Sequence, residues 1–336
     1  MRVLAGDIGG THTRLLLADV TSGVVHVVVE AQYASGAFDG LASIIAAFLA
    51  SHPRDPGIEA ACFALAGPIV DTPAGQHAKI TNLSWQVDAT ALAQTLDIPQ
   101  ILLINDFEAV GYGIDALTDD DLVALQPGAP RAQAPRVVLG AGTGLGVALL
   151  SWCGEGYTVV TGEGGHQDFA PRDAQQHALL QHLERKFGHV SYERVLSGPG
   201  LCDIHAFLRN RGAASESSEL ETATTADDPA AAISAAALAG RDAFAVAALD
   251  LFVDIYGAFA GNLALLTLAR GGVFLAGGIA PKILPKLQDA RFLRAFTDKG
   301  RFAPLLAEFP VRVVRNPRVG LLGAARVAWR SIAHMK

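Results

Sequence analysis

Apolar and polar positions alternate in short blocks through the first 35 residues of the chain. Apolar or β-branched runs at residues 2–6, 14–20 and 24–30 are separated by breaks that contain Gly-Gly or Thr-Ser-Gly. Such runs, with turn residues between them, predict strands joined by tight turns. The protein is therefore expected to open with a three-strand meander.

The next segments add helices and buried strands. Residues 41–51 carry apolar side chains at helical spacing, and residues 89–96 follow Asp88, a residue type that caps helices. The segments 60–66 and 100–104 are continuously apolar, which is typical of strands buried on both faces. The predicted order is β-β-β-α-β-α-β, which differs from the plain β-α-β repeat of a dinucleotide-binding fold.

The same order begins again after residue 136. Strands are predicted at 137–140, 147–152 and 157–161. Helices are predicted over 174–187 and 241–269, and a buried strand over 273–276. We therefore expect two copies of one α/β topology, each opening with a glycine turn between strands.

Composition and charge exclude several kinds of partner. With 51% hydrophobic residues, a chain of 336 residues can bury a sizeable core, in two domains or one large one. The formal net charge of -7 disfavours nucleic acid, because binding to it depends on Lys and Arg that neutralise phosphates. A small phosphorylated ligand stays allowed, since a glycine loop and a metal ion can hold phosphates without a basic surface.

Cysteine usage and the apolar runs predict a cytoplasmic protein without a membrane span. Cys62, Cys153 and Cys202 form no C-x-x-C pair, which favours buried thiols in a reducing compartment over a zinc site or a disulfide framework. Asp7 interrupts any signal-peptide apolar region. The apolar run 255–269 is shorter than the ~20 residues of a membrane span, so a buried helix is expected there.

The turn between the first two predicted strands is a candidate phosphate-binding loop. It consists of Gly6, Asp7, Ile8, Gly9, Gly10 and Thr11. Glycines let backbone N–H groups approach an anion closely, and consecutive N–H groups form a concave anion site. Asp7 could hold Mg²⁺ directly or through water, and Thr11 adds a hydroxyl donor. For this turn alone, a tight hairpin without a ligand is an equal alternative.

Two further glycine turns follow in the second half. The segment 140–146 has glycine at alternate positions around Thr143, and ordering four glycines costs enough backbone entropy to favour a ligand-facing role. Leu145 breaks the G-x-G-x-x-G dinucleotide fingerprint, and the chain has no Gly-Lys pair, which excludes a P-loop. Gly277 and Gly278 follow a buried strand and could lie against a nucleotide base or ribose, or form a plain strand–turn–helix connection.

Asn105 and Asp106 directly follow the predicted strand 100–104. Ligands of α/β folds bind at such strand ends, and a carboxylate there could accept the proton of a hydroxyl that attacks phosphorus. The alternative is that these two residues cap a helix that begins near Glu108. Both roles are compatible.

A second group of polar residues lies in glycine-rich segments. Glu163 and His166 flank two glycines, which predicts a loop rather than a metal-binding helix. Glu193 precedes a sharp turn, and a solvated helix residue is its alternative. Carboxylates, an amide and an imidazole would match the many hydroxyls of a sugar, because buried polar groups on both sides of a complex must be paired.

These segments resemble the bacterial glucokinase family, within the actin-like and hexokinase-like ATPase superfamily, over nearly the whole chain. The most specific blocks are Gly-Glu-Gly-Gly-His at 162–166 and Glu-Arg-Val-Leu-Ser-Gly-Pro-Gly at 193–200. The resemblance implies a two-domain α/β fold of the actin-like, ribonuclease H-like kind with a ligand cleft between the domains. The small domain would contain residues 1–116 and 317–336, including a returning C-terminal helix, and the large domain residues 117–316.

The resemblance also implies phosphoryl transfer from Mg·ATP to the 6-hydroxyl of glucose, in glycolysis, by a cytoplasmic homodimer. Asp106 matches the catalytic base of the family. The implied glucose ligands are Asn82, Asn105, Asp106, Gly144, Glu163, His166 and Glu193. The implied nucleotide contacts are Gly6, Asp7, Ile8, Gly9, Gly10, Thr11, Gly142, Thr143, Gly277 and Gly278, with Asp7 near Mg²⁺. His12 departs from the asparagine that usually follows Gly-Gly-Thr, which leaves the phosphate contact at that position open.

Three alternatives stay open beside this interpretation. They are a kinase for another hexose or an amino sugar, a sugar-sensing regulator without turnover, and an actin-like ATPase that uses no sugar. The regulator is disfavoured because the sequence starts directly with the first strand instead of a DNA-binding helix pair. The repressor/open-reading-frame/kinase branch is disfavoured because its cysteine-rich zinc motif is missing.

Overall fold

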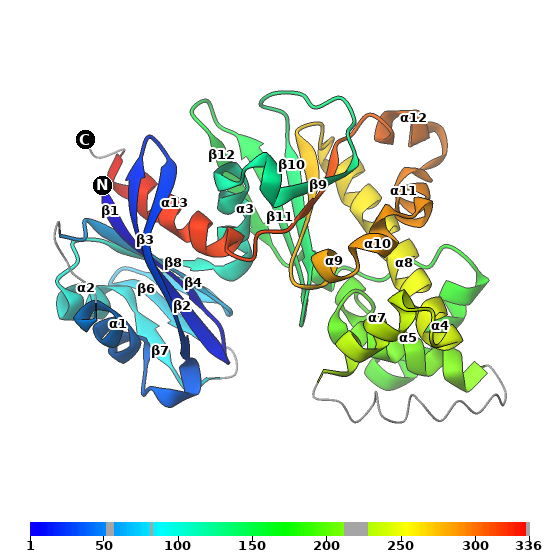
Figure 1. The fold of residues 1–336 in the computed structure, drawn as a ribbon, viewed down its shortest axis with the longest axis horizontal. Coiled ribbons are helices and arrows are strands. Elements are labelled where there is room, and N and C mark those ends of the chain that lie inside the picture. Colours follow the sequence, from blue (N-terminus) through cyan, green and yellow to red (C-terminus); the bar gives the residue numbers. More distant parts are fainter. Residues whose placement is uncertain (52–56, 81–82, 212–227, 334–336) are drawn as a thin grey trace. The chain divides into compact units, whose positions relative to one another are not determined.

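The structure, a computed structural model, describes residues 1–51, 57–80, 83–211 and 228–333 (Figure 1). Contacts divide the chain into two compact units. Unit 1 contains Met1–Asp121, Tyr157–Thr161 and Asn316–Lys336, and unit 2 contains Leu122–Gly156 and Gly162–Arg315. The sequence places its domain boundaries after residues 116 and 316 and does not single out the segment Tyr157–Thr161.

A mixed sheet with the strand order β3-β2-β1-β4-β8 forms the centre of unit 1 (Figure 1). Its strands are β1 (Arg2–Ile8), β2 (His12–Thr21), β3 (Val24–Ala34), β4 (Ala60–Leu65) and β8 (Ile101–Asn105). The first three form the predicted antiparallel meander, and β4 and β8 run parallel to β1. Every residue of β4 is buried, which confirms the interpretation of its continuous apolar run.

Helices cover both faces of this sheet. The described helices of unit 1 are α1 (Leu41–Ala50), α2 (Ala89–Leu96), α3 (Asp106–Gly113) and α13 (Val319–Ala333). Leu4 and Ile8 of β1 share an apolar core with α1 and α2, whereas Val3 and Ala5 share another with α3 and α13. Successive side chains of a strand point to opposite faces, so β1 contributes to both cores.

A small antiparallel sheet in unit 1 is absent from the sequence prediction. Its strands are β5 (Ile69–Thr72), β6 (Gly75–Lys79) and β7 (Gln86–Asp88). They are short, and most of their residues are polar and at least partly exposed, so they lack the apolar run that marks a core strand. The Gln76 side chain accepts a hydrogen bond from the Leu103 backbone N–H at 2.8 Å, which attaches β6 to β8.

The backbones of α3 and α13 approach each other very closely, and glycines make this possible. A Cβ on Gly323 would overlap the carbonyl oxygen of Ala109, and a Cβ on Gly113 would overlap that of Val319. The close contact fixes α3, the helix that begins at Asp106, against the rest of unit 1.

We expect Gly323→Ala to destabilise the protein by roughly 3 kcal/mol, because the added methyl meets backbone rather than a flexible side chain. Gly320→Ala in the same helix is the matched control. Its Cβ would lie 3.6 Å from Val110 Cγ2, an ordinary contact, so its effect should be neutral or stabilising by up to about 1 kcal/mol. Urea unfolding of both variants measures the difference, and equal midpoints would contradict the predicted helix contact.

The second large sheet repeats this strand order and adds one edge strand. Its order is β12-β11-β10-β13-β14-β9. The strands are β9 (Leu122–Gln126), β10 (Arg136–Ala141), β11 (Leu145–Trp152), β12 (Tyr157–Gly162), β13 (Gly272–Ala276) and β14 (Val311–Val314). β10 pairs antiparallel with β11 and parallel with β13, as β1 does with β2 and β4. The prediction of two copies of one topology is confirmed.

A long apolar helix forms the centre of the core of unit 2. The described helices of this unit are α4 (Ala174–Phe187), α5 (Gly198–Arg211), α7 (Pro229–Leu238), α8 (Ala243–Thr267), α9 (Ile279–Lys282), α10 (Leu284–Gln288), α11 (Ala290–Thr297) and α12 (Ala303–Leu306). Within the described ranges, α8 alone is long and apolar enough to cross a membrane, but 67% of its most apolar window is buried inside the protein. This burial confirms the predicted core helix.

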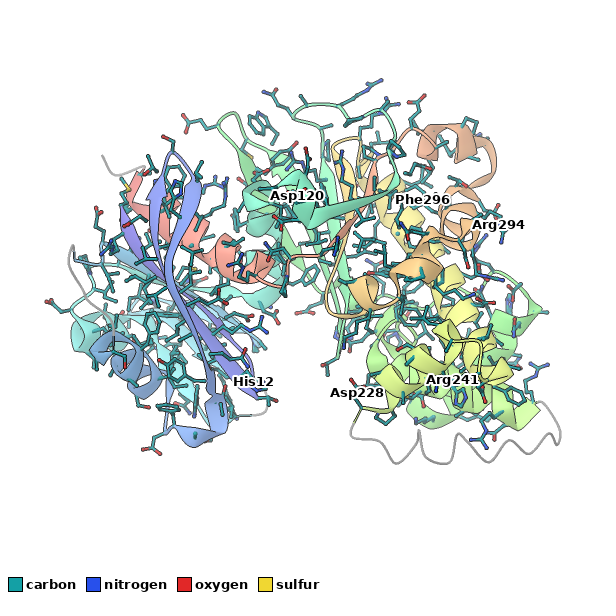
Figure 2. All side chains as sticks on the ribbon, viewed as in Figure 1. His12, Asp120, Asp228, Arg241, Arg294 and Phe296 are labelled. Atoms are coloured by element: carbon teal, nitrogen blue, oxygen red, sulfur yellow. The ribbon has the colours of Figure 1, made fainter. Side chains whose placement is uncertain are left out.

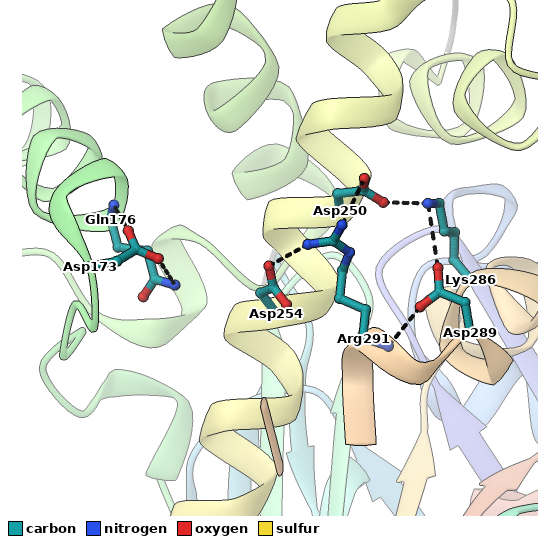
Figure 3. Close-up of polar contacts among 7 residues, drawn as sticks. All are labelled: Asp173, Gln176, Asp250, Asp254, Lys286, Asp289 and Arg291. Carbon is teal, nitrogen blue, oxygen red and sulfur yellow. Dashed lines mark hydrogen bonds and ion pairs between the residues drawn. The ribbon is translucent and has the colours of Figure 1, made fainter. Parts of the chain in front are cut away.

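Ion pairs connect α10 and α11 to α8 (Figure 3). Lys286 contacts Asp250 and lies 3.5 Å from Asp289, while Arg291 lies 3.3 Å from Asp250 and 2.8 Å from Asp254. Because each charge has a partner within the group, these residues orient α11 on α8, and we assign them no ligand.

The cysteines bear out the sequence interpretation only in part. Cys62 is buried in β4, Cys202 is only partly buried and Cys153 is exposed, so the expectation of buried thiols is wrong for Cys153. The reason is local, because Cys153 lies in the tight turn after β11, where its N–H donates to the carbonyl of Gly156 at 2.9 Å. The three cysteines, all within the described residues, form no disulfide.

Candidate functional site

The turn between β1 and β2 is held by buried hydroxyl groups. Gly9 N–H donates to the carbonyl of His12 at 3.0 Å, and Ser35 N–H donates to the carbonyl of Thr11 at 2.9 Å. The Ser35 hydroxyl donates to the carbonyl of Gly9 at 2.8 Å and lies 3.0 Å from the Thr13 hydroxyl. Ser35 and Thr13 are completely buried. The turn therefore has a fixed shape, as a preformed anion site requires.

Asp7 lies near the end of β1, just before this turn, and is directly opposite Arg14 in the strand register. Burial raises the pKa of Asp7, whereas the positive charge of Arg14 lowers it. Burial thus opposes ionisation of this carboxyl, and a bound cation would favour the ionised form. A carboxyl in this setting fits the candidate cation site that the sequence predicts beside the glycine turn.

The strand register places Asn105 and the glycine turn at the same edge of the sheet. Ile8 of β1 pairs with Leu65 of β4, which pairs with Asn105 of β8. The backbones of Ile8 and Asn105 are therefore two strand spacings apart, which is about 10 Å. The glycine turn and the start of α3 therefore lie at one edge of the sheet, two strands apart.

Asn105 and Asp106 begin α3, so the capping alternative is confirmed for Asn105. The Oδ1 of Asn105 accepts hydrogen bonds from the N–H groups of Phe107 at 2.8 Å and Glu108 at 3.2 Å. Asp106 is the first residue of the helix, and its Oδ1 also accepts from Phe107 N–H at 2.8 Å. The side chain of Asp106 is exposed, which leaves it accessible to a ligand.

The corresponding turn in unit 2 is held by the segment around Glu193. Gly142 N–H donates to the carbonyl of Gly144 at 2.8 Å, and Gly198 N–H donates to the carbonyl of Gly142 at 2.8 Å. Leu145 N–H donates to Oε2 of Glu193 at 2.9 Å. A Cβ on Gly144 would lie 2.6 Å from the same Oε2, so glycine is needed there for this carboxylate to reach the turn.

His166 approaches the other oxygen of Glu193. His166 Nε2 lies 4.0 Å from Glu193 Oε1, and both side chains are partly exposed. Glu163 is exposed, and its carbonyl accepts from His166 N–H at 3.0 Å within a single 3-10 turn. A Cβ on Gly165 would overlap the carbonyl of Leu145, so the loop packs directly on β11.

The predicted loop around Glu163 and His166 is confirmed, and the solvated-helix alternative for Glu193 is wrong. Glu193 lies in a 3-10 turn (Tyr192–Arg194), and its carboxylate is bonded to the glycine turn. Within the described residues, no group of three His, Cys, Asp or Glu side chains is placed to hold a metal ion. Glu163 and His166 lie at a single 3-10 turn rather than on an α-helix, as the glycines between them predict.

Gly277 and Gly278 lie beside the same turn. Gly277 has φ +78°, a left-handed conformation that favours glycine, and a Cβ there would lie 2.6 Å from the carbonyl of Ala141. Register pairs Gly140 with Ala276, so the second and third glycine turns follow adjacent parallel strands. A Cβ on Gly278 would meet nothing within 4 Å, so sterics do not explain that glycine.

The structure assembles most of the predicted residues into two sets. In unit 1 these are the glycine turn with Asp7, Asn105 and Asp106, and in unit 2 they are Gly142–Gly144, Glu163, His166, Glu193, Gly277 and Gly278. Asn82 lies outside the described residues. His12 is exposed at the start of β2, beside the first turn (Figure 2).

Sequence reasoning missed two serines whose hydroxyl groups form hydrogen bonds to the backbone of these two groups of residues. Ser35 supports the first turn, and Ser197 is buried, with its hydroxyl donating to the carbonyl of Glu193 at 2.7 Å. Ser197 also accepts from Gly200 N–H at 3.1 Å. Ser197 directly precedes α5, where a capping serine could have been predicted, whereas Ser35 stands in no such pattern.

Comparison with known proteins identifies one family. A sequence profile described as Glucokinase matches residues 4–331. The chain is 48% identical to the glucokinase of Nostoc sp. (strain PCC 7120) over 98% of its own length and 99% of that protein. Among solved structures, the glucokinase of an Antarctic psychrotroph matches with a TM-score of 0.84 and 29% identity over 98% of this chain and 99% of that one.

A second structural match carries a sugar. It is the glucokinase of Balamuthia mandrillaris, solved in complex with glucose, with a TM-score of 0.73 and 25% identity over 98% of this chain and 93% of that one. These similarities confirm the family resemblance and the predicted two-domain ATPase fold class.

Proposed function

The chain belongs to the glucokinase family, and on that premise we propose that it transfers the γ-phosphoryl group of ATP to the 6-hydroxyl of glucose. The observation that carries the proposal is the strand register in unit 1. It places Asn105, and with it the carboxylate of Asp106, at the same sheet edge as a braced glycine turn. Phosphoryl transfer depends on holding the acceptor hydroxyl and the phosphate close together and in line, so groups for both must lie at one edge.

Asp106 is the proposed general base. Its position in the first turn of α3 favours the ionised carboxylate, because the N-terminal end of a helix carries a partial positive charge. An ionised carboxylate can orient the attacking hydroxyl and accept its proton as the bond to phosphorus forms. Asn105 contributes an amide beside it, and the Oδ1 of that amide is already engaged in the helix cap.

The residues around Asp7 fit Mg²⁺. Mg²⁺ commonly keeps several waters and binds through one or two carboxylates together with substrate phosphates, so a single carboxylate beside a phosphate turn is sufficient. Asp7 would hold the ion through water. When bound, Mg²⁺ neutralises charge on the phosphates of the nucleotide.

The proposed sugar contacts of unit 2 are Gly144, Glu163, His166 and Glu193. Carboxylates accept hydrogen bonds from sugar hydroxyls, and charge-assisted hydrogen bonds of this kind are stronger than neutral ones. Because Glu193 also accepts a bond from the glycine turn, its orientation is fixed before a sugar binds. Nucleotide contacts are proposed for Gly6–Thr11, Gly142, Thr143, Gly277 and Gly278, and Asn82 completes the proposed sugar set.

A substrate panel tests the proposal. The purified protein is incubated with ATP and Mg²⁺ and with glucose, mannose, fructose or N-acetylglucosamine, and sugar phosphate is measured directly. Glucose 6-phosphate should form fastest. Preference for another sugar would reassign the substrate, and ATP hydrolysis independent of any sugar would favour the ATPase alternative.

Three finer features belong to the same proposal. We propose a homodimer that acts in the cytoplasm at the entry of glucose into glycolysis. Light scattering on the purified protein tests the dimer, and growth on glucose after deletion of the gene tests the metabolic role.

A further inference from the structure

A backbone hydrogen bond connects the two segments of unit 2 that carry proposed sugar contacts. Tyr192 N–H donates to the carbonyl of Gln167 at 2.9 Å. Gln167 directly follows His166, and Tyr192 directly precedes Glu193 in the chain. The residues just beyond this bond form an isolated antiparallel bridge, so the two segments run side by side. The separation between His166 and Glu193 therefore depends on where the backbone of Tyr192 lies.

The side chain of Tyr192 attaches the turn that carries Glu193 to the core helix α8. Only 4% of Tyr192 is exposed, and its ring stacks on Phe259 of α8, with ring centres 4.0 Å apart and planes 27° apart. The edge of this pair meets the ring of Phe169, whose centre lies 5.8 Å from that of Tyr192. The Tyr192 hydroxyl accepts from Nδ2 of Asn262, also on α8, at 3.3 Å. Both the ring and the hydroxyl of Tyr192 are thus bonded or packed onto one face of the helix.

The carbonyl of Tyr192 closes the turn that carries Glu193. It accepts from the N–H groups of Val195 at 3.0 Å and Leu196 at 2.7 Å. The backbone of Glu193 is held by this turn, while its carboxylate accepts from Leu145 N–H at 2.9 Å. A shift of Tyr192 would move Glu193 away from Leu145 and from a sugar bound beside it. A displacement of about 1 Å in such a site can cost roughly 10²-fold in rate.

We propose that Tyr192 is a positioning residue for the sugar, which holds Glu193 in place by attaching its turn to α8. The proposal rests on the sugar-binding role assigned to Glu193 above. Tyr192 acts through Glu193, because its own ring is buried against Phe259 and needs no contact with the sugar.

Three variants test this role through kcat/KM for glucose, measured at saturating ATP and per folded molecule. Tyr192→Leu removes the stacked ring, and we expect kcat/KM to fall about 10- to 100-fold, mainly through a higher KM, as for the loss of one charge-assisted hydrogen bond. Tyr192→Phe keeps the ring on Phe259 and should stay within about threefold of the wild type. Phe296→Leu changes another fully buried ring of the same core (Figure 2), and should lower the melting temperature but leave kcat/KM unchanged.

A double-mutant cycle separates positioning from general packing. In the Glu193→Ala background, Tyr192→Leu should lower kcat/KM by less than about threefold, because a residue that acts through Glu193 has nothing left to position. A purely structural loss would instead multiply with that of Glu193→Ala. Phe259→Leu, which removes the other ring of the stack, is a second variant with an expected loss of about 3- to 10-fold.

A loss of kcat/KM in Tyr192→Leu that disappears in the Glu193→Ala background supports the proposal. Wild-type kcat/KM in Tyr192→Leu and Phe259→Leu, an equal loss in Phe296→Leu, or losses that multiply in the cycle overturn it. The wild-type protein is assayed in parallel, and failure to form glucose 6-phosphate would defeat the proposed function itself. An impaired Glu193→Ala variant beside an unimpaired Tyr192→Leu variant defeats the positioning role alone.

Discussion

Asp106→Asn should lower kcat by roughly 10²- to 10⁴-fold, the usual contribution of general acid–base catalysis. Asparagine has nearly the same shape, and its oxygen can still accept the hydrogen bond that Phe107 N–H donates to the native carboxylate. The start of α3 should therefore survive, and the melting temperature should change little. What the variant loses is a carboxylate that can take the proton of the attacking hydroxyl.

Steady-state rates of glucose 6-phosphate formation, with circular dichroism as a check of folding, measure this effect. Asp120→Asn is a matched control, because Asp120 is an exposed aspartate of the same unit (Figure 2) and we assign it no ligand. It should keep wild-type turnover. A folded Asp106→Asn variant with near wild-type kcat would mean that the proton goes to another group.

Much of the fold could be predicted because its core strands and helices are strongly apolar segments with clear boundaries. β4 is apolar at each position and buried at each position, and α2 begins where Asp88 predicts, with the Asp88 carboxylate accepting from Ala91 N–H at 2.9 Å. The duplicated strand order could be predicted because the same succession of apolar strands and glycine turns begins again after residue 136. The sheet β5–β6–β7 was missed because its strands have no apolar run. It is attached to β8 by the hydrogen bond from Leu103 N–H to the Gln76 side chain, which no hydrophobic pattern reveals.

The candidate site was predictable in its residue types but only partly in its contacts. Glycine at 144 could be explained by a ligand, yet the structure gives a second reason, since a side chain there would collide with Glu193. The sequence separation of 48 residues between Leu145 and Glu193 leaves no local pattern from which their bond could be inferred. Likewise, Ser35 braces a turn that lies far from it in sequence.

Glu193→Ala should lower kcat/KM for glucose by roughly 10³-fold. Two losses combine: a charge-assisted bond to a sugar hydroxyl is worth about 1.5–3 kcal/mol, and a buried N–H left without its acceptor costs about 1–3 kcal/mol. The N–H is that of Leu145, which donates to Glu193 at 2.9 Å. Because this bond also holds the glycine turn, the KM for ATP should rise as well.

Glu193→Gln separates the two losses. Its amide oxygen can still accept from Leu145 N–H, so the turn should keep its shape and the KM for ATP should stay near the wild type. The negative charge beside His166 is gone, so kcat/KM for glucose should still fall, by about 10- to 30-fold. Glu184→Ala, an exposed glutamate of α4, serves as the control. If Glu193→Ala and Glu193→Gln raise the KM for ATP equally, Glu193 does not hold the turn, and if neither affects glucose, it does not bind the sugar.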